Sequence, residues 1–254
     1  MISVSGIRGR VGHGFDPAVV VSFAAAFGAW AIGKGAARTV VLGRDSRVTG
    51  PLFHGVARAA LESVGATVID IGLTTTPTLQ LAVEHHHAAG GLMISASHNP
   101  IEWNALKFIG PDGLFLSAAA GAEMRAGLDG GVAYATWDGL GTTMADTAAA
   151  ERHIAAVLAL PYVDVTAIRA RRFRVAYDAC RGAGSVIIPA LLERLGCEVT
   201  AINLEPDGRF PRPPEPVPEH LGDLERLVRE SGAVVGFATD PDVDRLALVA
   251  DGGV

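Results

Sequence analysis

Strand-like and helical segments alternate along the first half of this 254-residue chain, and this alternation restricts the fold more than any other feature. Apolar runs typical of strands occur at 39–42, 66–71 and 92–94, and helical stretches separate them. Strands that alternate with helices predict an α/β fold with a largely parallel sheet and right-handed crossovers. Functional side chains are then expected at the carboxyl ends of the strands.

The same alternation resumes beyond residue 147. Further strand-like runs occur at 173–177, 197–203 and 233–238, again with helical stretches between them. We therefore predict two consecutive α/β domains with mainly parallel, mixed sheets. The expected division is 1–146 and 147–254.

Charge and composition exclude several classes of protein. The formal net charge of −6 gives no general attraction for nucleic acid. Charged, Gly or Pro residues interrupt every apolar stretch before it reaches membrane length, and no signal peptide is evident. The only two cysteines, Cys180 and Cys197, fall in predicted core segments. These features predict a cytoplasmic protein with reduced thiols and no nucleic-acid or membrane partner.

A serine-containing loop follows the buried run 92–94. The loop reads Ser95-Ala96-Ser97-His98-Asn99-Pro100, and Lys107 lies a few residues further on. A serine at the carboxyl end of a strand, beside a histidine and near a lysine, has the components of an activated nucleophile. The alternative is a polar turn whose hydroxyls bond to their own backbone, and a Ser-His pair alone favours that turn.

An acidic loop follows the predicted strand 233–238. It reads Asp240-Pro241-Asp242-Val243-Asp244-Arg245, with a carboxylate at every second position. Such carboxylates repel one another unless a cation joins them, and oxygen ligands alone suit Mg²⁺. The alternative is a solvated acidic loop. The position directly after a buried strand favours the metal site.

Three further segments have open interpretations. The Gly-rich segment 178–185 is either a phosphate cradle or a tight strand-to-helix turn. Arg8, between two glycines, is either a phosphate contact or a solvated side chain in an ordinary turn. Adjacent side chains in His85-His86-His87 point in different directions on a helix, so we predict a solvent-facing helix end there and no metal site.

The serine loop, with Asn104, Lys107 and the segment 110–113 after it, closely resembles the phosphoserine loop of the α-D-phosphohexomutases. This family includes phosphoglucomutase, phosphomannomutase and phosphoglucosamine mutase. Other segments resemble family motifs as well, and together they extend over nearly the whole chain. They are residues 5–9, 43–47, 178–185, 206–211 and 240–245. After Pro211 the family's usual asparagine and histidine are replaced, and the chain reads Arg212-Pro-Pro-Glu-Pro216.

The resemblance implies an intramolecular phosphotransferase that interconverts hexose 1-phosphate and 6-phosphate through a phosphoserine enzyme and a bisphosphate intermediate. It implies that Ser97 carries the phosphate. Its implied Mg²⁺ ligands are Ser97, Asp240, Asp242 and Asp244.

The other implied roles concern proton transfer and phosphate binding. Lys107 is the candidate proton shuttle, while His98 either shares that task or positions the loop. Arg8, Arg245 and Asn104 are the candidate contacts to phosphate or substrate. Hexose phosphate and hexose bisphosphate are the implied partners.

The motifs correspond to the first two of the family's four domains. No segment resembles the sugar-recognition loop of the third domain or the phosphate-binding loop of the fourth, so we expect an incomplete and inactive fragment ending at Val254. The alternative, should the two-domain chain be complete, is a non-catalytic phosphosugar-binding protein. The choice among glucosamine, glucose and mannose phosphates stays open, as does the oligomeric state.

Overall fold

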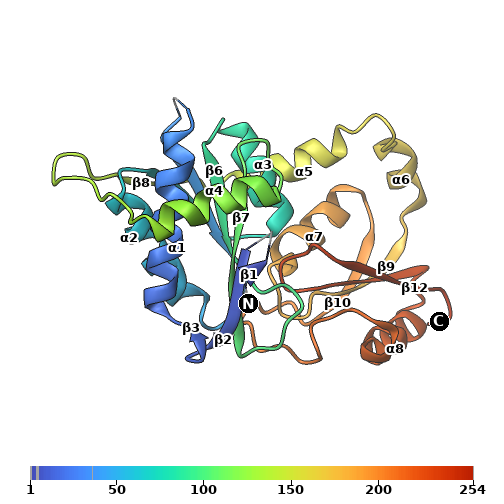
Figure 1. The fold of residues 1–254 in the computed structure, drawn as a ribbon. Coiled ribbons are helices and arrows are strands. Elements are labelled where there is room, and N and C mark those ends of the chain that lie inside the picture. The colour runs from blue at the N-terminus through green and yellow to red at the C-terminus, as the bar shows by residue number, and fades with distance from the viewer. Residues whose placement is uncertain (1, 4–5, 36, 254) are drawn as a thin grey trace. The chain divides into compact units, whose positions relative to one another are not determined.

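The computed structural model describes residues 2–3, 6–35 and 37–253, and Ser5 of the segment 5–9 lies outside them. The chain forms two compact units, each with its own sheet and helices (Figure 1). Two short segments from the first half of the sequence belong to the second unit. The first unit comprises residues 1–45, 49–96 and 102–149, and the second comprises 46–48, 97–101 and 150–254.

The described part of the first unit contains a mixed eight-stranded sheet with the order β1-β2-β7-β6-β4-β5-β8, in which β3 pairs with β2. Strands β6, β4 and β5 run parallel, as predicted, and β8 adds a further parallel strand beside β5. Strand β7 pairs antiparallel with β6, and β2 pairs antiparallel with β7. The strands are β1 (Ile2–Ser3), β2 (Gly6–Val11), β3 (Gly14–Phe15), β4 (Thr39–Arg44), β5 (Thr67–Leu73), β6 (Gly90–Ile94), β7 (Trp103–Ile109) and β8 (Thr143–Ala145).

Strands β2 and β7 were not predicted from the sequence: an ordinary turn was one interpretation of the segment around Arg8, and no strand was predicted at 103–109. Both strands carry polar or charged residues among the apolar ones, with glycines in β2, so neither gives a strong strand pattern. Their pairing with each other and with β6 stabilises them. The structure therefore places Arg8 and Lys107 on strands.

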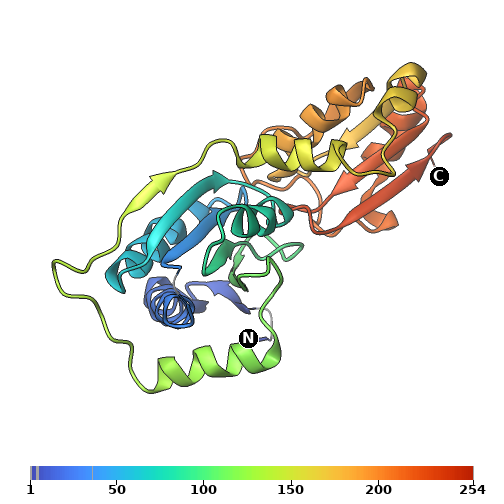
Figure 2. The same ribbon diagram turned by 90° about the horizontal axis from the view of Figure 1, so that it is seen from above.

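Helices cover both faces of this sheet, as the alternation of buried side chains requires. Val40 and Leu42 face the larger core, which α1, α2 and α4 complete, and Val41 faces the core beneath α3. Helix α4 packs on the outer side of α1 (Figure 2). The helices are α1 (Pro17–Gly33), α2 (Gly50–Ser63), α3 (Thr76–His85) and α4 (Ala118–Asp129).

The start of α1 shows how local sequence determines these elements. The Asp16 side chain accepts a hydrogen bond of 3.0 Å from the Val19 backbone N–H, and Pro17 occupies the first turn, where its missing N–H costs nothing. From this start the helix runs to Gly33.

The described part of the second unit contains a four-stranded sheet with the order β10-β9-β11-β12, in which β12 alone runs antiparallel. Leu224 and Val228 of α8 pack on one face of it. The elements are α5 (Ala149–Leu158), α6 (Val165–Arg171), β9 (Arg174–Asp178), α7 (Gly184–Arg194), β10 (Glu198–Ile202), the short 3₁₀ helix η1 (Pro218–His220), α8 (Gly222–Ser231), β11 (Val235–Thr239) and β12 (Leu246–Ala250). Among the described residues, no helix combines the length and apolar character needed to cross a bilayer.

Candidate functional site

The acidic loop connects β11 to β12 and brings its carboxylates together. One ligand oxygen from each of Asp240, Asp242 and Asp244 lies within 4.8 Å of the others. Asp240 and Asp242 are fully buried, and Asp244 is exposed. Buried carboxylates are rare unless they are paired with cations or bind metals, so this arrangement favours a metal site over a solvated loop.

The backbone of the acidic loop adopts an unusual conformation. Val243 has a φ of +62°, which a β-branched residue rarely adopts. The Asp240 carboxylate fixes this turn, because its Oδ1 accepts hydrogen bonds of 3.1 Å from the backbone N–H groups of both Asp244 and Arg245. Strain of this kind persists only where neighbouring contacts enforce it, and it occurs often at functional sites.

Electrostatics show that the loop needs a positive charge or a proton. Burial, together with the charges of Asp242 and Asp244, raises the pKa of Asp240 to about 8. A divalent cation would take the place of that proton. The available ligands are carboxylate oxygens, which are the donors that Mg²⁺ prefers, so the residues fit this ion.

The Gly-rich segment 178–185 supports the acidic loop. The Ala183 N–H donates to the Pro241 carbonyl at 2.8 Å, and a Cβ added to Gly182 would lie 2.7 Å from the Pro241 Cα. The Arg181 N–H donates to the Asn203 carbonyl. Because these N–H groups bond to backbone acceptors, the geometry favours the tight turn over the phosphate cradle.

Ser97 reaches this cluster from the segment 97–101, which belongs to the same unit. Its Oγ lies 2.6 Å from Asp240 Oδ2, 3.0 Å from Asp244 Oδ1 and 3.2 Å from His98 Nδ1. Ser97 is 7% exposed, with a φ of +49°. The serine and the three carboxylates that the sequence analysis selected therefore lie together.

Arg47 holds the serine loop in place, a role that was not predicted from the sequence. The buried guanidinium donates to the backbone carbonyls of Ser97, Asn99 and Pro100 at 2.6, 2.7 and 2.8 Å. The Phe210 ring packs on it, with its centroid 5.1 Å from Cζ. The Gly-Arg-Asp-Ser-Arg segment 43–47 pointed to this residue, but only the structure shows what it binds.

We expect Arg47→Met to destabilise the second unit by about 3 kcal/mol or more, since it removes three charge-assisted hydrogen bonds and leaves buried carbonyls without donors. Arg47→Lys should recover part of the loss, because an ammonium cannot reach all three carbonyls. Urea unfolding measures the loss of unfolding free energy in both variants. Arg229→Met is the control, since the Arg229 guanidinium makes a 3.2 Å bond to one carbonyl, that of Gly253. Equal losses for Arg47→Met and Arg229→Met would contradict the assignment.

Arg8 and Lys107 lie in the first unit, on the paired strands β2 and β7. Arg8 is opposite Ala105 and Lys107 is opposite Gly6, so both cationic side chains project from the same face of the sheet. Both are partly exposed. This arrangement suits a pair of groups that bind anions, and their roles stay predictions.

Asn104 is buried on the opposite face of β7, and its amide is engaged at both ends. Its Nδ2 donates to the Thr49 hydroxyl at 2.9 Å, and its Oδ1 accepts from the Ala105 N–H at 2.8 Å. These contacts favour a structural role at the start of α2, and contact with substrate stays a prediction.

Arg245 follows the acidic loop, and its guanidinium forms an ion pair with Glu215. Both side chains are partly exposed, at 41% and 42%, so the pair contributes little to stability. The guanidinium therefore stays accessible, as a phosphate contact would require, and this role also remains a prediction.

The histidine run lies at the end of α3, and His85 and His87 are exposed, as the sequence analysis expected. His86 Nε2 lies 2.8 Å from Asp146 Oδ2. Among the described residues, one group of three or more side chains has the geometry to hold a metal ion, and it is the three aspartates of the acidic loop. None of these histidines belongs to it.

Two sequence profiles match the chain. The profile described as phosphoglucomutase/phosphomannomutase, alpha/beta/alpha domain I, matches residues 2–131, and the domain II profile matches residues 151–253. The first range contains the strands of the first sheet except β8, and the second range contains the described strands of the second sheet.

Curated relatives match the chain over nearly its whole length. A probable phosphoglucosamine mutase of Methanopyrus kandleri is 38% identical over 98% of this chain and 53% of its own length. A phosphoglucomutase/phosphomannomutase of Thermococcus kodakarensis is 37% identical over 98% of this chain and 54% of its own length. The chain thus spans about half the length of these relatives.

Solved structures agree with the sequence comparisons. A putative phosphomannomutase from Thermus thermophilus superposes with a TM-score of 0.88 at 28% identity, covering 100% of this chain and 57% of that one. A phosphoglucomutase/phosphomannomutase family protein from Burkholderia thailandensis gives a TM-score of 0.84 at 26% identity, covering 100% and 56%. On the profiles, relatives and structures together, the chain belongs to the phosphoglucomutase/phosphomannomutase family of phosphohexomutases.

Proposed function

We propose that Ser97 carries a transferable phosphate, and that the protein uses it to interconvert hexose 1-phosphate and hexose 6-phosphate. The observation that supports this most directly is the position of the Ser97 Oγ, which lies within hydrogen-bonding distance of two carboxylates of the acidic loop. A nucleophilic hydroxyl beside a three-carboxylate cluster suits phosphoryl transfer, in which catalysis is mainly positioning and charge stabilisation.

In the proposed reaction the phosphoserine gives its phosphoryl group to the free hydroxyl of a hexose monophosphate. The sugar hydroxyl loses a proton, the bond from phosphorus to Ser97 Oγ breaks, and a hexose 1,6-bisphosphate forms. The bisphosphate then returns its other phosphoryl group to Ser97, which leaves the isomeric monophosphate and regenerates the phosphoserine.

Asp240, Asp242 and Asp244, with an oxygen of the Ser97 phosphate, would hold Mg²⁺. The ion would neutralise the charge that develops on the transferring phosphoryl group. Without such a cation, the three carboxylates would repel the neighbouring phosphate strongly. This repulsion supports the assignment of a Mg²⁺ site to the acidic loop.

The remaining residues have proposed roles in proton transfer and substrate binding. Lys107 would take the proton from the sugar hydroxyl and return it, and the cation Arg8 on the neighbouring strand would favour the neutral amine that this task needs. His98 Nδ1 lies 3.2 Å from the Ser97 Oγ, so it would orient the hydroxyl or share the proton. Arg8, Arg245 and Asn104 would contact phosphate or sugar.

Relatives are named for glucosamine, glucose and mannose phosphates, so the substrate assays should include all three. This chain spans about half the length of each of these relatives. We therefore expect this chain alone to accept a phosphate on Ser97 without turning over any hexose phosphate. The free thiols Cys180 and Cys197 fit the cytoplasmic location that we propose.

The test is incubation of the chain with glucose 1,6-bisphosphate and Mg²⁺, followed by intact-mass measurement and peptide mapping. We expect a single phosphate in the peptide that contains Ser97. A coupled mutase assay with the three hexose 1-phosphates should show no turnover. Binding of the bisphosphate with no phosphate on the protein would instead indicate a non-catalytic phosphosugar-binding protein.

A further inference from the structure

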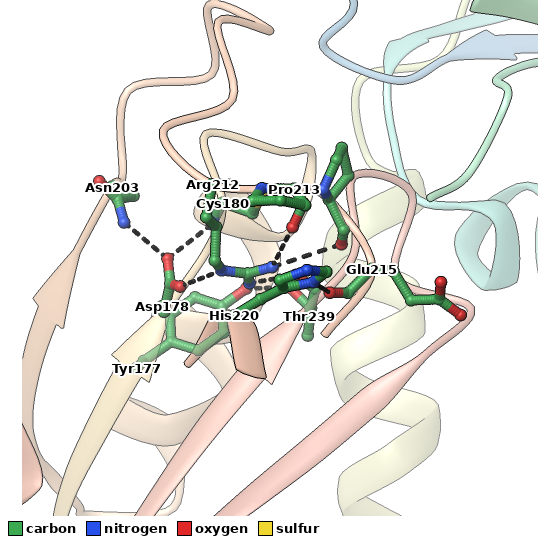
Figure 3. Close-up of polar contacts among 10 residues, drawn as sticks. Tyr177, Asp178, Cys180, Asn203, Arg212, Pro213, Glu215, His220 and Thr239 are labelled. Carbon is green, nitrogen blue, oxygen red and sulfur yellow. Dashed lines mark hydrogen bonds and ion pairs between the residues drawn. The ribbon is translucent and has the colours of Figure 1, made fainter. Parts of the chain in front are cut away.

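A long segment without regular secondary structure, from residue 203 to 217, connects β10 to η1 in the second unit. Arg212 lies within it, and its guanidinium reaches the carboxyl ends of two strands (Figure 3). Its Nε lies 2.6 Å from Asp178 Oδ2 at the end of β9, and Nη2 donates to the Thr239 carbonyl at the end of β11, 3.2 Å away. The Arg212 and Asp178 side chains are 10% and 2% exposed, so this ion pair is buried.

The two acceptors of Arg212 at the strand ends, Asp178 and Thr239, are themselves fixed. Asp178 Oδ1 accepts from the Cys180 N–H at 2.9 Å and from Asn203 Nδ2 at 2.8 Å. The Thr239 hydroxyl lies 2.9 Å from the Tyr177 hydroxyl (Figure 3). Thr239 is the residue directly before Asp240, so Arg212 binds the backbone at the point where the acidic loop begins.

The segment around Arg212 also contacts the residues that hold the serine loop. Gly208 lies so close to them that an added Cβ would be 2.3 Å from the Ser46 carbonyl oxygen, and the Phe210 ring covers Arg47. On the other side of Arg212, Glu215 forms an ion pair with Arg245 of the acidic loop. The segment from 208 to 215 thus joins the supports of both loops.

We propose that Arg212 is a positioning residue for the acidic loop: by pairing with Asp178 and bonding to the Thr239 carbonyl, it keeps the three carboxylates in their metal-binding arrangement. The inference rests on the proposed function for the identity of the ligand, Mg²⁺. The loop needs such a support because its carboxylates repel one another and because Val243 has a positive φ. The bond from Arg212 to the Thr239 carbonyl lets it act on the loop through the backbone.

The first test is calorimetric titration of the full chain with Mg²⁺. We expect Arg212→Gln to weaken binding about tenfold, as the loss of an outer partner of metal ligands typically does. Arg212→Lys keeps the charge but cannot reach Asp178 and the Thr239 carbonyl in the same geometry. Its affinity for Mg²⁺ should therefore lie between those of the unaltered chain and Arg212→Gln. Val228→Ala, which shortens a side chain on the buried face of α8, is the control: it should lower stability and leave the affinity for Mg²⁺ unchanged.

The second test needs no metal. Hydrogen exchange in EDTA reports the backbone N–H groups of Asp244 and Arg245, which bond to Asp240 Oδ1. Under the proposal these amides exchange at least several times faster in Arg212→Gln than in the unaltered chain, and at the unaltered rate in Val228→Ala. Unchanged exchange in Arg212→Gln would overturn the inference.

The two tests separate the failure of this inference from the failure of the proposed function. Suppose that the unaltered chain binds Mg²⁺, that Asp242→Asn no longer binds it, and that Arg212→Gln binds it as tightly as the unaltered chain. The positioning role of Arg212 is then wrong, and the metal site stands. If the unaltered chain binds no Mg²⁺, the proposed metal is wrong, and the exchange experiment alone decides whether Arg212 holds the loop.

Discussion

The Ser97→Ala variant should take up no phosphate from glucose 1,6-bisphosphate, whereas the unaltered chain becomes phosphorylated. The hydroxyl that is removed lies 2.6 and 3.0 Å from two carboxylates of the acidic loop. Alanine also has a Cβ, so the positive φ at residue 97 costs it no more than it costs serine, and the loop should keep its shape. Intact-mass measurement after incubation with bisphosphate and Mg²⁺ gives the result directly.

Ser95→Ala is the matched control, because Ser95 is the other serine of the same loop. Ser95 is fully buried, and its backbone N–H donates to the Ala105 carbonyl within the first unit. We expect Ser95→Ala to become phosphorylated as the unaltered chain does. Phosphate on Ser97→Ala, or its loss in Ser95→Ala alone, would contradict the assignment of the nucleophile.

The sequence predicted the parts of this site that lie in short contiguous segments. The serine loop follows the fully buried strand β6 and the acidic loop follows the partly buried strand β11, so alternation and local composition indicated both loops, whereas the choice of Ser97 within the serine loop came from the family resemblance. That they meet could not be read from the residues alone, since the contact between Ser97 and Asp240 joins positions 143 apart. Only the resemblance to a family connected the two loops.

The supporting arginines were harder to predict for the same physical reason. Arg47 binds carbonyls 50 or more positions away, and Arg212 binds a carboxylate 34 positions away, so neither contact leaves a local pattern. The strand β7 was missed because its pairing partners, β2 and β6, stabilise a segment whose own pattern is weak. Arg212 stood where the family usually has other residues, and this departure was the only signal in the sequence.

The Asp242→Asn variant should bind Mg²⁺ on the order of a hundredfold more weakly, because the loss of a ligand costs at least as much as the loss of its outer partners. It should also be more stable than the unaltered chain in EDTA, by about 1 kcal/mol or more, because one of the mutually repelling buried charges is gone. Calorimetry measures the first effect, and urea unfolding in EDTA measures the second.

The control is Asp223→Asn, which removes a carboxylate of the same type from the exposed surface of α8, where Asp223 pairs with Arg226. It should change neither the affinity for Mg²⁺ nor, by more than a few tenths of a kcal/mol, the stability. If Asp242→Asn bound Mg²⁺ as tightly as Asp223→Asn does, the acidic loop would be only a solvated turn.

The same cluster predicts how stability depends on pH in EDTA. The pKa of Asp240 is raised to about 8 in the folded chain, by burial and by the charges of Asp242 and Asp244, whereas an unfolded aspartate has a pKa of about 3.9. Between these values the folded state keeps a proton that the unfolded state has released. The contribution of Asp240 to the free energy of unfolding is therefore fully present below about pH 4 and is lost as the pH rises toward 8.

Asp242→Asn should flatten this dependence, because removing a neighbouring negative charge lowers the pKa of Asp240 toward its ordinary value. Urea unfolding of both chains in EDTA, in steps from about pH 5 to about pH 8.5, gives the two slopes across the upper part of the transition. Asp223→Asn should keep the slope of the unaltered chain. Equal slopes in all three chains would mean that the charge of Asp242 does not raise the pKa of Asp240, which would contradict the proposed repulsion between the two carboxylates.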